Sequence, residues 1–553
     1  MGQNLREHYA VRWTSRPESA GAGSRLTKMP STTELKRSEG MHKRAVIISI
    51  GLITFIGALL RLYNPKSFYY DEFFSISMAQ AKWRVFWQVL HHDANMLLYY
   101  LLLRAWIHIG TGEFAIRLLS VSLGIVTIVA IFLVGKRLFG VSTGLIAAGL
   151  LAFNGFHIMY SQQVRSYSLL ALLTVLSFWA LVEAVESGAS KQWVVYGVLV
   201  GLAFYAHFLA VLTIASQAAA LLARGTRKAC WKGMLAAGAT ALLMGLPMVV
   251  FIALNHQLHG SQIPWIPTVG VAQFWQMLRV LTGDGGNWLP LAFLVLAVCS
   301  IWSVGKSAAK WSVVLCCCGF LIPLLLAFAV SVKQPAFFPH WLHKLEKPVF
   351  VPRFLIASIV PLTLLTAAGI ASLPRTLRFA VAAIMLAIVL WPLPAYYRWN
   401  GYNDWHSVVA YLQKEDGITS FEYPSLAADF IYYAPNKRAA IPFEGAVAEW
   451  WHAETLEHYP AFLSQLRSEP RLWIVDMDEP TAGYGKLRFY FGTSHPWQQG
   501  PEQVTSELAR LNVQSDDPVA KLLVETFPYV YEKRLPGLKL KLFSKTLIAG
   551  ASL

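Results

Sequence analysis

Long apolar runs, separated by short polar segments, repeat along about the first 400 residues of the chain. A helix needs about 20 mostly apolar residues to cross a membrane, and most of these runs approach that length. The runs predict eleven spans, at residues 45–63, 114–134, 141–159, 169–186, 193–206, 208–223, 233–254, 288–304, 312–331, 354–373 and 379–396. The pattern therefore predicts a polytopic α-helical membrane protein.

Basic residues give these spans a direction, because cytoplasmic loops are enriched in Lys and Arg. Residues 1–44 are polar and basic, which predicts a disordered cytoplasmic tail. The apolar run 96–110 is too short for a full crossing, and a crossing there would carry Lys136 and Arg137 to the outer side. We therefore predict that residues 64–113 form one external loop with amphipathic juxtamembrane helices.

The composition changes after the predicted transmembrane domain, residues 45–397. Residues 398–553 resemble ordinary globular sequence and predict a soluble α/β domain on the outer side. The local patterns predict strands at 418–421 and 472–475, a strand pair within 525–544, and helices at 404–414, 455–467 and 502–511.

Composition and charge support a membrane protein. The chain is 55% hydrophobic and only 14% charged, whereas soluble domains carry roughly 25% charged residues. The net charge of +16 is explained by basic cytoplasmic loops, so we expect no nucleic-acid partner. The five cysteines lie in or beside apolar runs, so no disulfide framework is predicted.

The adjacent carboxylates of Asp71 and Glu72 follow the first span and are flanked by aromatic residues. Two carboxylates in a solvated loop are one interpretation. The other is a general base, or a carboxylate that orients an acceptor hydroxyl, beside aromatic rings that can stack on a sugar. Asp93 follows two histidines and is either a helix N-cap or a second acidic or metal-binding element.

Cationic side chains also gather at the predicted outer boundary. Arg165 lies between two spans, Arg353 opens another, and Lys344 precedes it. Each can simply extend to lipid headgroups, or it can bind a phosphate. His207 lies between two short spans, where a histidine is more often a satisfied polar group than a ligand.

Several motifs together resemble a known family. In chain order they are YYDEFFSISMAQ, LLYYLLLRAWIHIG, EFAIRLLSVSLG, GKRLFG, MYSQQVRSYSLLAL, FYAHFLAV and VPRFLIASIVPLTLL. The set resembles the bacterial GT-C glycosyltransferases of the dolichyl-phosphate-mannose–protein mannosyltransferase group, which includes lipid A aminoarabinose transferases. The resemblance covers about residues 45–400.

The resemblance implies a polyprenyl-phosphate sugar donor that is used on the periplasmic side of a bacterial inner membrane, usually with inversion. Asp71 matches the family's catalytic acidic position, and Arg165 and Arg353 match its phosphate-binding arginines. Two departures are visible. Gln163 stands where many relatives have Glu, and His92-Asp93-Ala94-Asn95 stands where relatives often have two prolines.

We therefore predict a GT-C glycosyltransferase whose acceptor is lipid A or lipopolysaccharide, another lipid, a glycan or a protein. The predicted site comprises Asp71, Glu72 and Asp93 for catalysis, Arg165, Arg353 and Lys344 for the donor phosphate, and Tyr70, His92, Gln162, Tyr167 and His207 for substrate binding. No metal is required by this scheme, although the histidines leave room for a divalent ion.

Other functions stay open at this point. A lipid-linked oligosaccharide transferase or ligase would use a pyrophosphate lipid as its donor. A lipid flippase or transporter would place charged residues in the middle of its spans, which are nearly free of charge here. A non-catalytic scaffold would not need the carboxylate pair. The sequence leaves the sugar, the acceptor, the role of the C-terminal domain and the oligomeric state open.

Overall fold

The structure is a computed structural model. It describes residues 32–92, 95–225, 231–254, 269–304, 309–332, 349–399, 401, 403–421, 426–440, 459–477, 522–523 and 525–547. The chain divides into two compact units, residues 1–48 and 49–553. In the first unit the structure describes only residues 32–48, which are helical. The site and the fold discussed below belong to the second unit.

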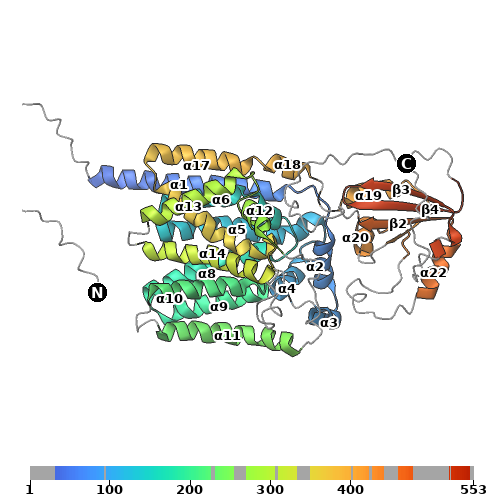
Figure 1. Cartoon of the computed structure of the whole chain (residues 1–553), viewed down its shortest axis with the longest axis horizontal. Coiled ribbons are helices and arrows are strands. Elements are labelled where there is room, and N and C mark those ends of the chain that lie inside the picture. Colours follow the sequence, from blue (N-terminus) through green and yellow to red (C-terminus); the bar gives the residue numbers. More distant parts are fainter. Residues whose placement is uncertain are drawn as a thin grey trace, which may run out of the picture. The chain divides into compact units, whose positions relative to one another are not determined.

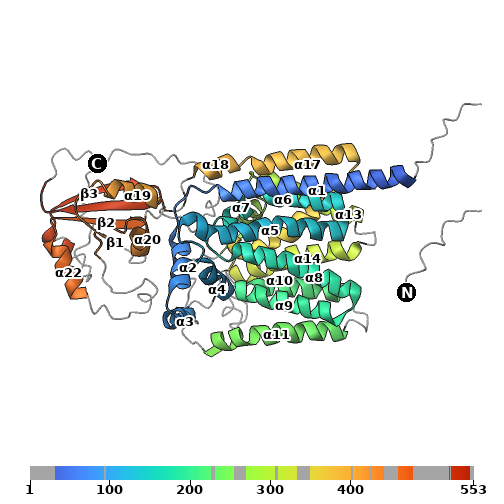
Figure 2. The same ribbon diagram turned by 180° about the vertical axis from the view of Figure 1, so that it is seen from behind.

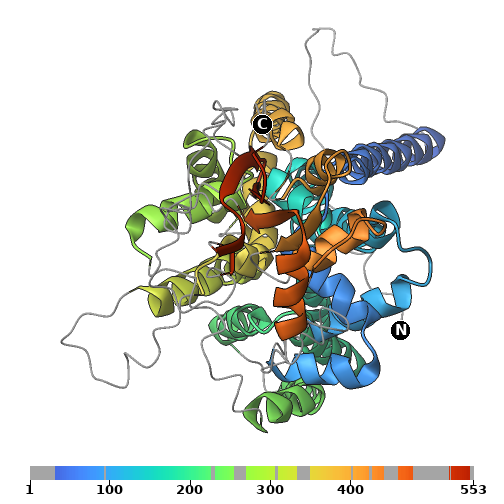
Figure 3. The ribbon, with the colours of Figure 1, turned by 90° about the vertical axis from the view of Figure 1, so that its right-hand side faces the viewer.

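The described part of the chain up to residue 398 is helical (Figures 1 and 2). In chain order the helices are α1 (Thr32–Leu62), α2 (Tyr70–Gln80), α3 (Trp83–His92), α4 (Leu97–Trp106), α5 (Glu113–Phe139), α6 (Val141–Phe153), α7 (Gly155–Ser161), α8 (Tyr167–Ser187), α9 (Ser190–Ala206), α10 (Ala210–Arg224), α11 (Trp231–Leu254), α12 (Val271–Leu281), α13 (Trp288–Val304), α14 (Lys310–Ser331), η3 (Pro352–Ser358), α16 (Ile359–Ala371), α17 (Arg375–Leu390) and α18 (Leu393–Arg398). The long helices run side by side, and Figure 3 shows many of them end-on.

Each of the predicted spans coincides with one of these helices or with a pair of them. By length and apolar composition, seven described helices can cross a membrane, or up to eight if the bent pair α6–α7 is one span. The predicted polytopic α-helical fold is confirmed. Residues 32–44, predicted as part of a disordered tail, are instead the start of α1, because Lys, Arg, Glu and Met are good helix formers.

The span α6–α7 is bent by 64° at Asn154, which the sequence pattern did not reveal. The Asn154 side chain accepts a hydrogen bond from the backbone of His157 and so caps α7. The guanidinium of Arg61 is fully buried and donates to the carbonyl oxygens of Leu151 and Ala152 beside the break. Such partners are needed because backbone groups released at a break have no water to bind inside a bilayer.

Glycines let the helices pack closely. A Cβ atom on Gly369 in α16 would lie 1.9 Å from the carbonyl oxygen of Leu296 in α13. A Cβ on Gly144 in α6 would lie 2.5 Å from the carbonyl oxygen of Phe132 in α5. Small residues at such crossings allow two membrane helices to approach backbone to backbone.

The predicted external loop contains three short helices, α2, α3 and α4. In α3 the side chains of Phe86 and Val89 are buried, whereas Trp83 and Trp87 are exposed. This two-sided pattern agrees with the predicted amphipathic juxtamembrane helices.

The described strands all lie after residue 398. They are β1 (Ile418–Phe421), β2 (Arg471–Met477), β3 (Tyr529–Leu535) and β4 (Leu538–Ser544), in the order β1-β2-β4-β3. β1 and β2 are parallel, and the other neighbouring pairs are antiparallel. These strands and the hairpin turn at Pro536-Gly537 agree with the sequence pattern, whereas the expected helix at 502–511 lies outside the described residues.

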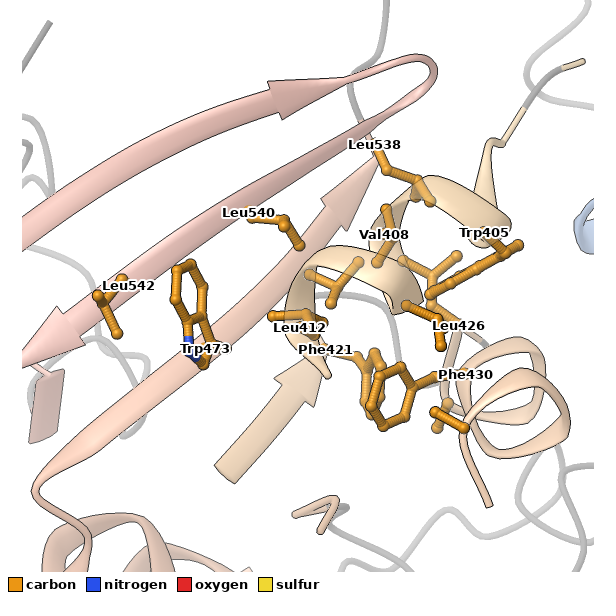
Figure 4. Close-up of a cluster of buried hydrophobic side chains, with 14 of the residues drawn as sticks. Trp405, Val408, Leu412, Phe421, Leu426, Phe430, Trp473, Leu538, Leu540 and Leu542 are labelled. Carbon is orange, nitrogen blue, oxygen red and sulfur yellow. The ribbon is translucent and has the colours of Figure 1, made fainter. Parts of the chain in front are cut away.

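Three described helices accompany the sheet: α19 (Trp405–Leu412), α20 (Leu426–Tyr433) and α22 (Tyr459–Ser468). Figure 4 shows the core that α19 and α20 form with the sheet. This core includes Trp405 and Leu412 of α19, Trp473 of β2 and Leu540 of β4. Burial of such large apolar side chains holds the α/β part together. The domain boundary at residue 398 itself stays a prediction.

Candidate active site

Asp71 lies in the first turn of α2 and faces a second segment of the chain. Its Oδ2 atom is 3.6 Å from Nη1 of Arg353, which follows Pro352 at the start of η3. Both side chains are about one-quarter exposed, at 24% and 22%. A carboxylate and a guanidinium therefore face each other where solvent or a substrate can still reach them.

Arg165 brings a second guanidinium to the same place. It lies in the loop between α7 and α8 and is 9% exposed. Its Nη1 donates to the backbone oxygen of Asp71 at 3.2 Å and to Oγ of Ser75 at 3.3 Å, whereas its Nε has no acceptor within the described residues. One carboxylate and two guanidinium groups leave a positive charge, which suits an anion such as a phosphate.

Tyr69 and Gln163 complete the surroundings of Asp71. The Tyr69 hydroxyl is 3.4 Å from Oδ2 of Asp71 and 3.3 Å from Oε1 of Gln163. A phenol has only one proton, so it can donate to one of these oxygens at a time. The Asp71 carboxylate and the Gln163 amide oxygen therefore share the single proton of the Tyr69 hydroxyl.

Glu72, the neighbour of Asp71, has a different environment. Its side chain is buried and forms two hydrogen bonds with Arg117 of α5, at 3.2 and 3.1 Å. It also accepts from the backbone N–H groups of Val164 and Tyr69. Burial raises the pKa of Glu72, and Arg117 and the two N–H groups oppose that rise. These contacts fix the first turn of α2 to α5 and to the 162–166 loop.

Gln162 and Tyr167 are buried on either side of Arg165. The Gln162 amide donates to the carbonyl oxygens of Leu60 and Tyr63, and its oxygen accepts from Tyr396. Tyr167 has a fully buried side chain, stacked edge-on against Tyr160. The Gln162 contacts hold the end of α1 and the helix α18 to the 162–166 loop.

His207, between α9 and α10, is buried close to the two arginines. Its ring centroid is 6.0 Å from that of Tyr167 and 5.2 Å from that of Phe354. Burial lowers the pKa of His207 to about 3, helped by the charges of Arg165 and Arg353. Its Nδ1 accepts a hydrogen bond from the backbone of Leu209. His207 is therefore a neutral polar group at physiological pH.

The remaining predicted site residues have no described side chain. Asp93 and Lys344 lie outside the described residues, and the side chains of Tyr70 and His92 are likewise not described. Their roles stay predictions. Within the described part of the chain, no three His, Cys, Asp or Glu side chains form a group that could hold a metal ion.

Sequence reasoning left three side chains out of the predicted site: Tyr69, Arg117 and Gln163. Arg117 carried a signal, because a charged residue inside an apolar run is functional or paired more often than not. Its partner could not be found from sequence, because Glu72 lies in a separate segment.

Comparisons with known proteins agree with this architecture. The family model described as dolichyl-phosphate-mannose-protein mannosyltransferase matches residues 95–252. No curated protein matches the chain significantly. The crystal structure of ArnT from Cupriavidus metallidurans, bound to undecaprenyl phosphate, is similar with a TM-score of 0.51 and 10% identity, over 91% of this chain and 98% of that chain.

The apo oligosaccharyltransferase of Archaeoglobus fulgidus aligns with a TM-score of 0.48 and 10% identity, over 78% of this chain and 69% of that chain. The family match and the fold shared with ArnT confirm the predicted GT-C fold class, with a multi-pass arrangement. The alignment with ArnT covers most of both chains, including the C-terminal part.

Proposed function

We propose that the chain is a membrane glycosyltransferase of the GT-C group that transfers a sugar from a polyprenyl-phosphate donor to an acceptor hydroxyl. The family match over residues 95–252 and the fold shared with ArnT support this proposal. The observation that carries this proposal is the cluster of Asp71, Arg165 and Arg353. It combines a partly exposed carboxylate, which can take a proton, with two guanidinium groups, which can bind a phosphate.

In the proposed reaction, the acceptor hydroxyl oxygen attacks the anomeric carbon of the sugar. The bond from that carbon to the phosphate oxygen breaks, and the electron pair leaves with the polyprenyl phosphate. Asp71 takes the proton from the attacking hydroxyl. A phosphate is already a good leaving group, so the scheme needs no strong acid and no metal.

The two arginines stabilise the phosphate as its charge grows. Arg165 is the more rigid of the two, because it is buried and bound to Asp71 and Ser75. Arg353 is more exposed and pairs with the Asp71 carboxylate. We propose that a bound donor phosphate draws Arg353 toward itself and leaves Asp71 to the acceptor.

Glu72 is assigned a positioning role, because each of its oxygens already accepts hydrogen bonds from Arg117 and from the backbone. Asp93 and Lys344 stay candidates for the acceptor side and for the donor phosphate. Tyr70, His92 and Tyr167 stay candidates for sugar binding, and His207 supplies a neutral polar surface beside the arginines.

We place the site on the periplasmic side of a bacterial inner membrane. The support is the distribution of basic residues, which puts residues 64–113 outside. Ser67 in that segment is hydrogen-bonded to the backbone of Asn403 and Trp405, so the C-terminal domain belongs to the same side. The acceptor class, among lipid A, another lipid, a glycan and a protein, stays open.

The test is transfer from a panel of radiolabelled polyprenyl-phosphate sugars by the purified protein, beside Asp71→Asn and the control Asp416→Asn. Asp416 is an exposed carboxylate in the C-terminal domain. Loss of a positioned general base costs about 100-fold or more, so we expect that drop in Asp71→Asn and wild-type activity in the control.

Equal activity in all three proteins would remove Asp71 from the chemistry. A wild-type protein that ignores every monosaccharide donor but consumes a lipid-linked oligosaccharide would replace the proposal with an oligosaccharide transferase.

A further inference from the structure

We propose that the C-terminal domain positions residues 63–72, the catalytic segment that carries Asp71. The hydroxyl of Tyr433 is the main contact through which it does so. The inference rests on the proposed function, in which Asp71 is the catalytic base. On this inference, the C-terminal domain holds the catalytic base in place, a role that does not depend on acceptor recognition.

The Tyr433 hydroxyl connects three parts of the molecule. It accepts a hydrogen bond from the backbone N–H of Phe68 at 2.8 Å, and it donates its own proton to the carboxylate of Glu113. Tyr433 ends α20 in the C-terminal domain, Phe68 precedes α2, and Glu113 begins α5. One hydroxyl therefore joins the C-terminal domain, the catalytic segment and a membrane helix.

A second contact of the same kind lies one residue earlier. The hydroxyl of Ser67 donates to the backbone oxygen of Asn403 at 2.5 Å and accepts from the backbone N–H of Trp405 at 3.0 Å. Ser67 is 5% exposed and Phe68 is fully buried, so these bonds are shielded from water. Two successive residues of the segment are thus bound by the C-terminal domain.

Aromatic packing adds to these hydrogen bonds. The ring of Tyr432 lies edge-on to Phe68 at 5.7 Å and to Phe73 at 5.4 Å, between ring centroids. The ring of Tyr433 meets Phe73 at 6.0 Å. Edge-on contacts of this kind are favourable and restrict how the rings can turn.

The position of Asp71 explains why these contacts matter. Glu72, on one side, is fixed to α5 by Arg117. Phe68, on the other side, is fixed by the C-terminal domain, and residues 63–69 have no helix or strand of their own. Asp71 therefore lies between two fixed points. A displacement of about 1 Å at a reacting group can cost roughly 100-fold in rate.

The experiment compares Tyr433→Phe with the matched control Tyr432→Phe. Both changes remove one hydroxyl and keep the ring, but the Tyr432 hydroxyl donates to the exposed backbone oxygen of Thr111. We expect kcat to fall about tenfold or more in Tyr433→Phe, with both KM values within about twofold of wild type. The control should keep wild-type kcat.

Hydrogen–deuterium exchange gives a second measurement that does not need activity. In Tyr433→Phe we expect faster exchange in the peptide that contains Phe68, with unchanged exchange in β2 and β4. Faster exchange throughout the sheet would mean that the domain itself is destabilised, which would overturn a specific positioning role.

Other outcomes also decide the matter. Unchanged kcat in Tyr433→Phe, or an equal loss in Tyr432→Phe, would overturn the inference while an active wild type upholds the proposed function. If wild type transfers no sugar at all, the proposed function fails. The positioning contact is tested separately by exchange: if the peptide that contains Phe68 exchanges equally slowly in wild type and in Tyr433→Phe, the contact is overturned.

Discussion

The ion pair between Glu72 and Arg117 is buried on both sides, with side-chain exposures of 2% and 6%. Removing one partner of a buried pair leaves the other charge without compensation, at a cost of about 3–5 kcal/mol. We expect Glu72→Gln to lower the free energy of unfolding by about that amount, measured in detergent by denaturant titration.

The matched control is Glu183→Gln, which breaks the exposed pair with Arg137. Exposed pairs contribute about 0–1 kcal/mol, so this variant should unfold almost as wild type does. Equal losses in the two variants would contradict the assignment of Glu72 as a structural support for its neighbour Asp71.

The arginines give a second prediction for single residues. Arg165→Lys and Arg353→Lys keep a positive charge but lose the planar fork that binds two phosphate oxygens. We expect each to raise the KM for the lipid-linked donor by about tenfold, an amount equivalent to one charge-assisted hydrogen bond. The control is Arg398→Lys, a change at an exposed residue in α18. A rise of about tenfold in the KM of that variant would show that the effect is not specific to Arg165 and Arg353.

Helix packing leads to a prediction at the level of elements. Gly369→Ala would push a methyl group against the backbone of Leu296, so α16 and α13 would have to separate. Overpacking of this kind costs about 1–3 kcal/mol. The control is Gly238→Ala in α11, where a Cβ meets nothing within 4 Å. We expect a lower thermal unfolding temperature for the first variant only, and similar temperatures would contradict the close crossing.

The contact between α19 and α5 should depend on pH. Nε2 of His406 is 3.4 Å from the Glu113 carboxylate. That hydrogen bond raises the pKa of His406, as do the charges of Glu113 and Asp404, whereas burial and Arg117 lower it. Because the pKa of His406 is higher in the folded protein, protonated His406 stabilises the fold. This stabilisation is complete below the pKa of the unfolded state, about 6.5, and it is lost as the pH rises through the pKa of the folded state.

The measurement compares wild type with His406→Gln between about pH 5.5 and 8.5, a range that brackets the ordinary histidine pKa. Wild type should have the higher unfolding temperature at the acidic end, and the difference should shrink as pH rises. A difference that is constant, or that grows with pH, would show that the His406 contact does not titrate as described.

For the whole molecule, sequence reasoning succeeded where the signal is local. Each membrane helix is its own apolar run, and the hairpin at Pro536-Gly537 is marked by its turn residues. It failed where structure depends on distant partners. The bend at Asn154 needs Arg61 from another helix, and the short helix α20 gains its order by burying Phe430 against α19 and β1.

The same distinction holds for the candidate site. Asp71, Arg165 and Arg353 were proposed because each stands out in its own polar segment at the predicted outer boundary. That Asp71 pairs with Arg353 could not be found from spacing, because no local periodicity relates residues so far apart. Neither could the different fates of the neighbours Asp71 and Glu72, since only the fold decides which one is buried.

The strand order β1-β2-β4-β3 has a consequence for how the protein is made. The strand β2, one of the two inner strands, leaves the ribosome long before the other, its antiparallel neighbour β4. Leu538, Leu540 and Leu542 of β4 supply part of the core that includes Trp405. The membrane helices all precede β2 in the chain, so they can enter the bilayer before β4 has emerged, because domains fold as their segments emerge. We expect a ribosome-stalled chain that ends before residue 529 to be inserted but inactive, so translation itself would delay the first turnover until the hairpin has emerged.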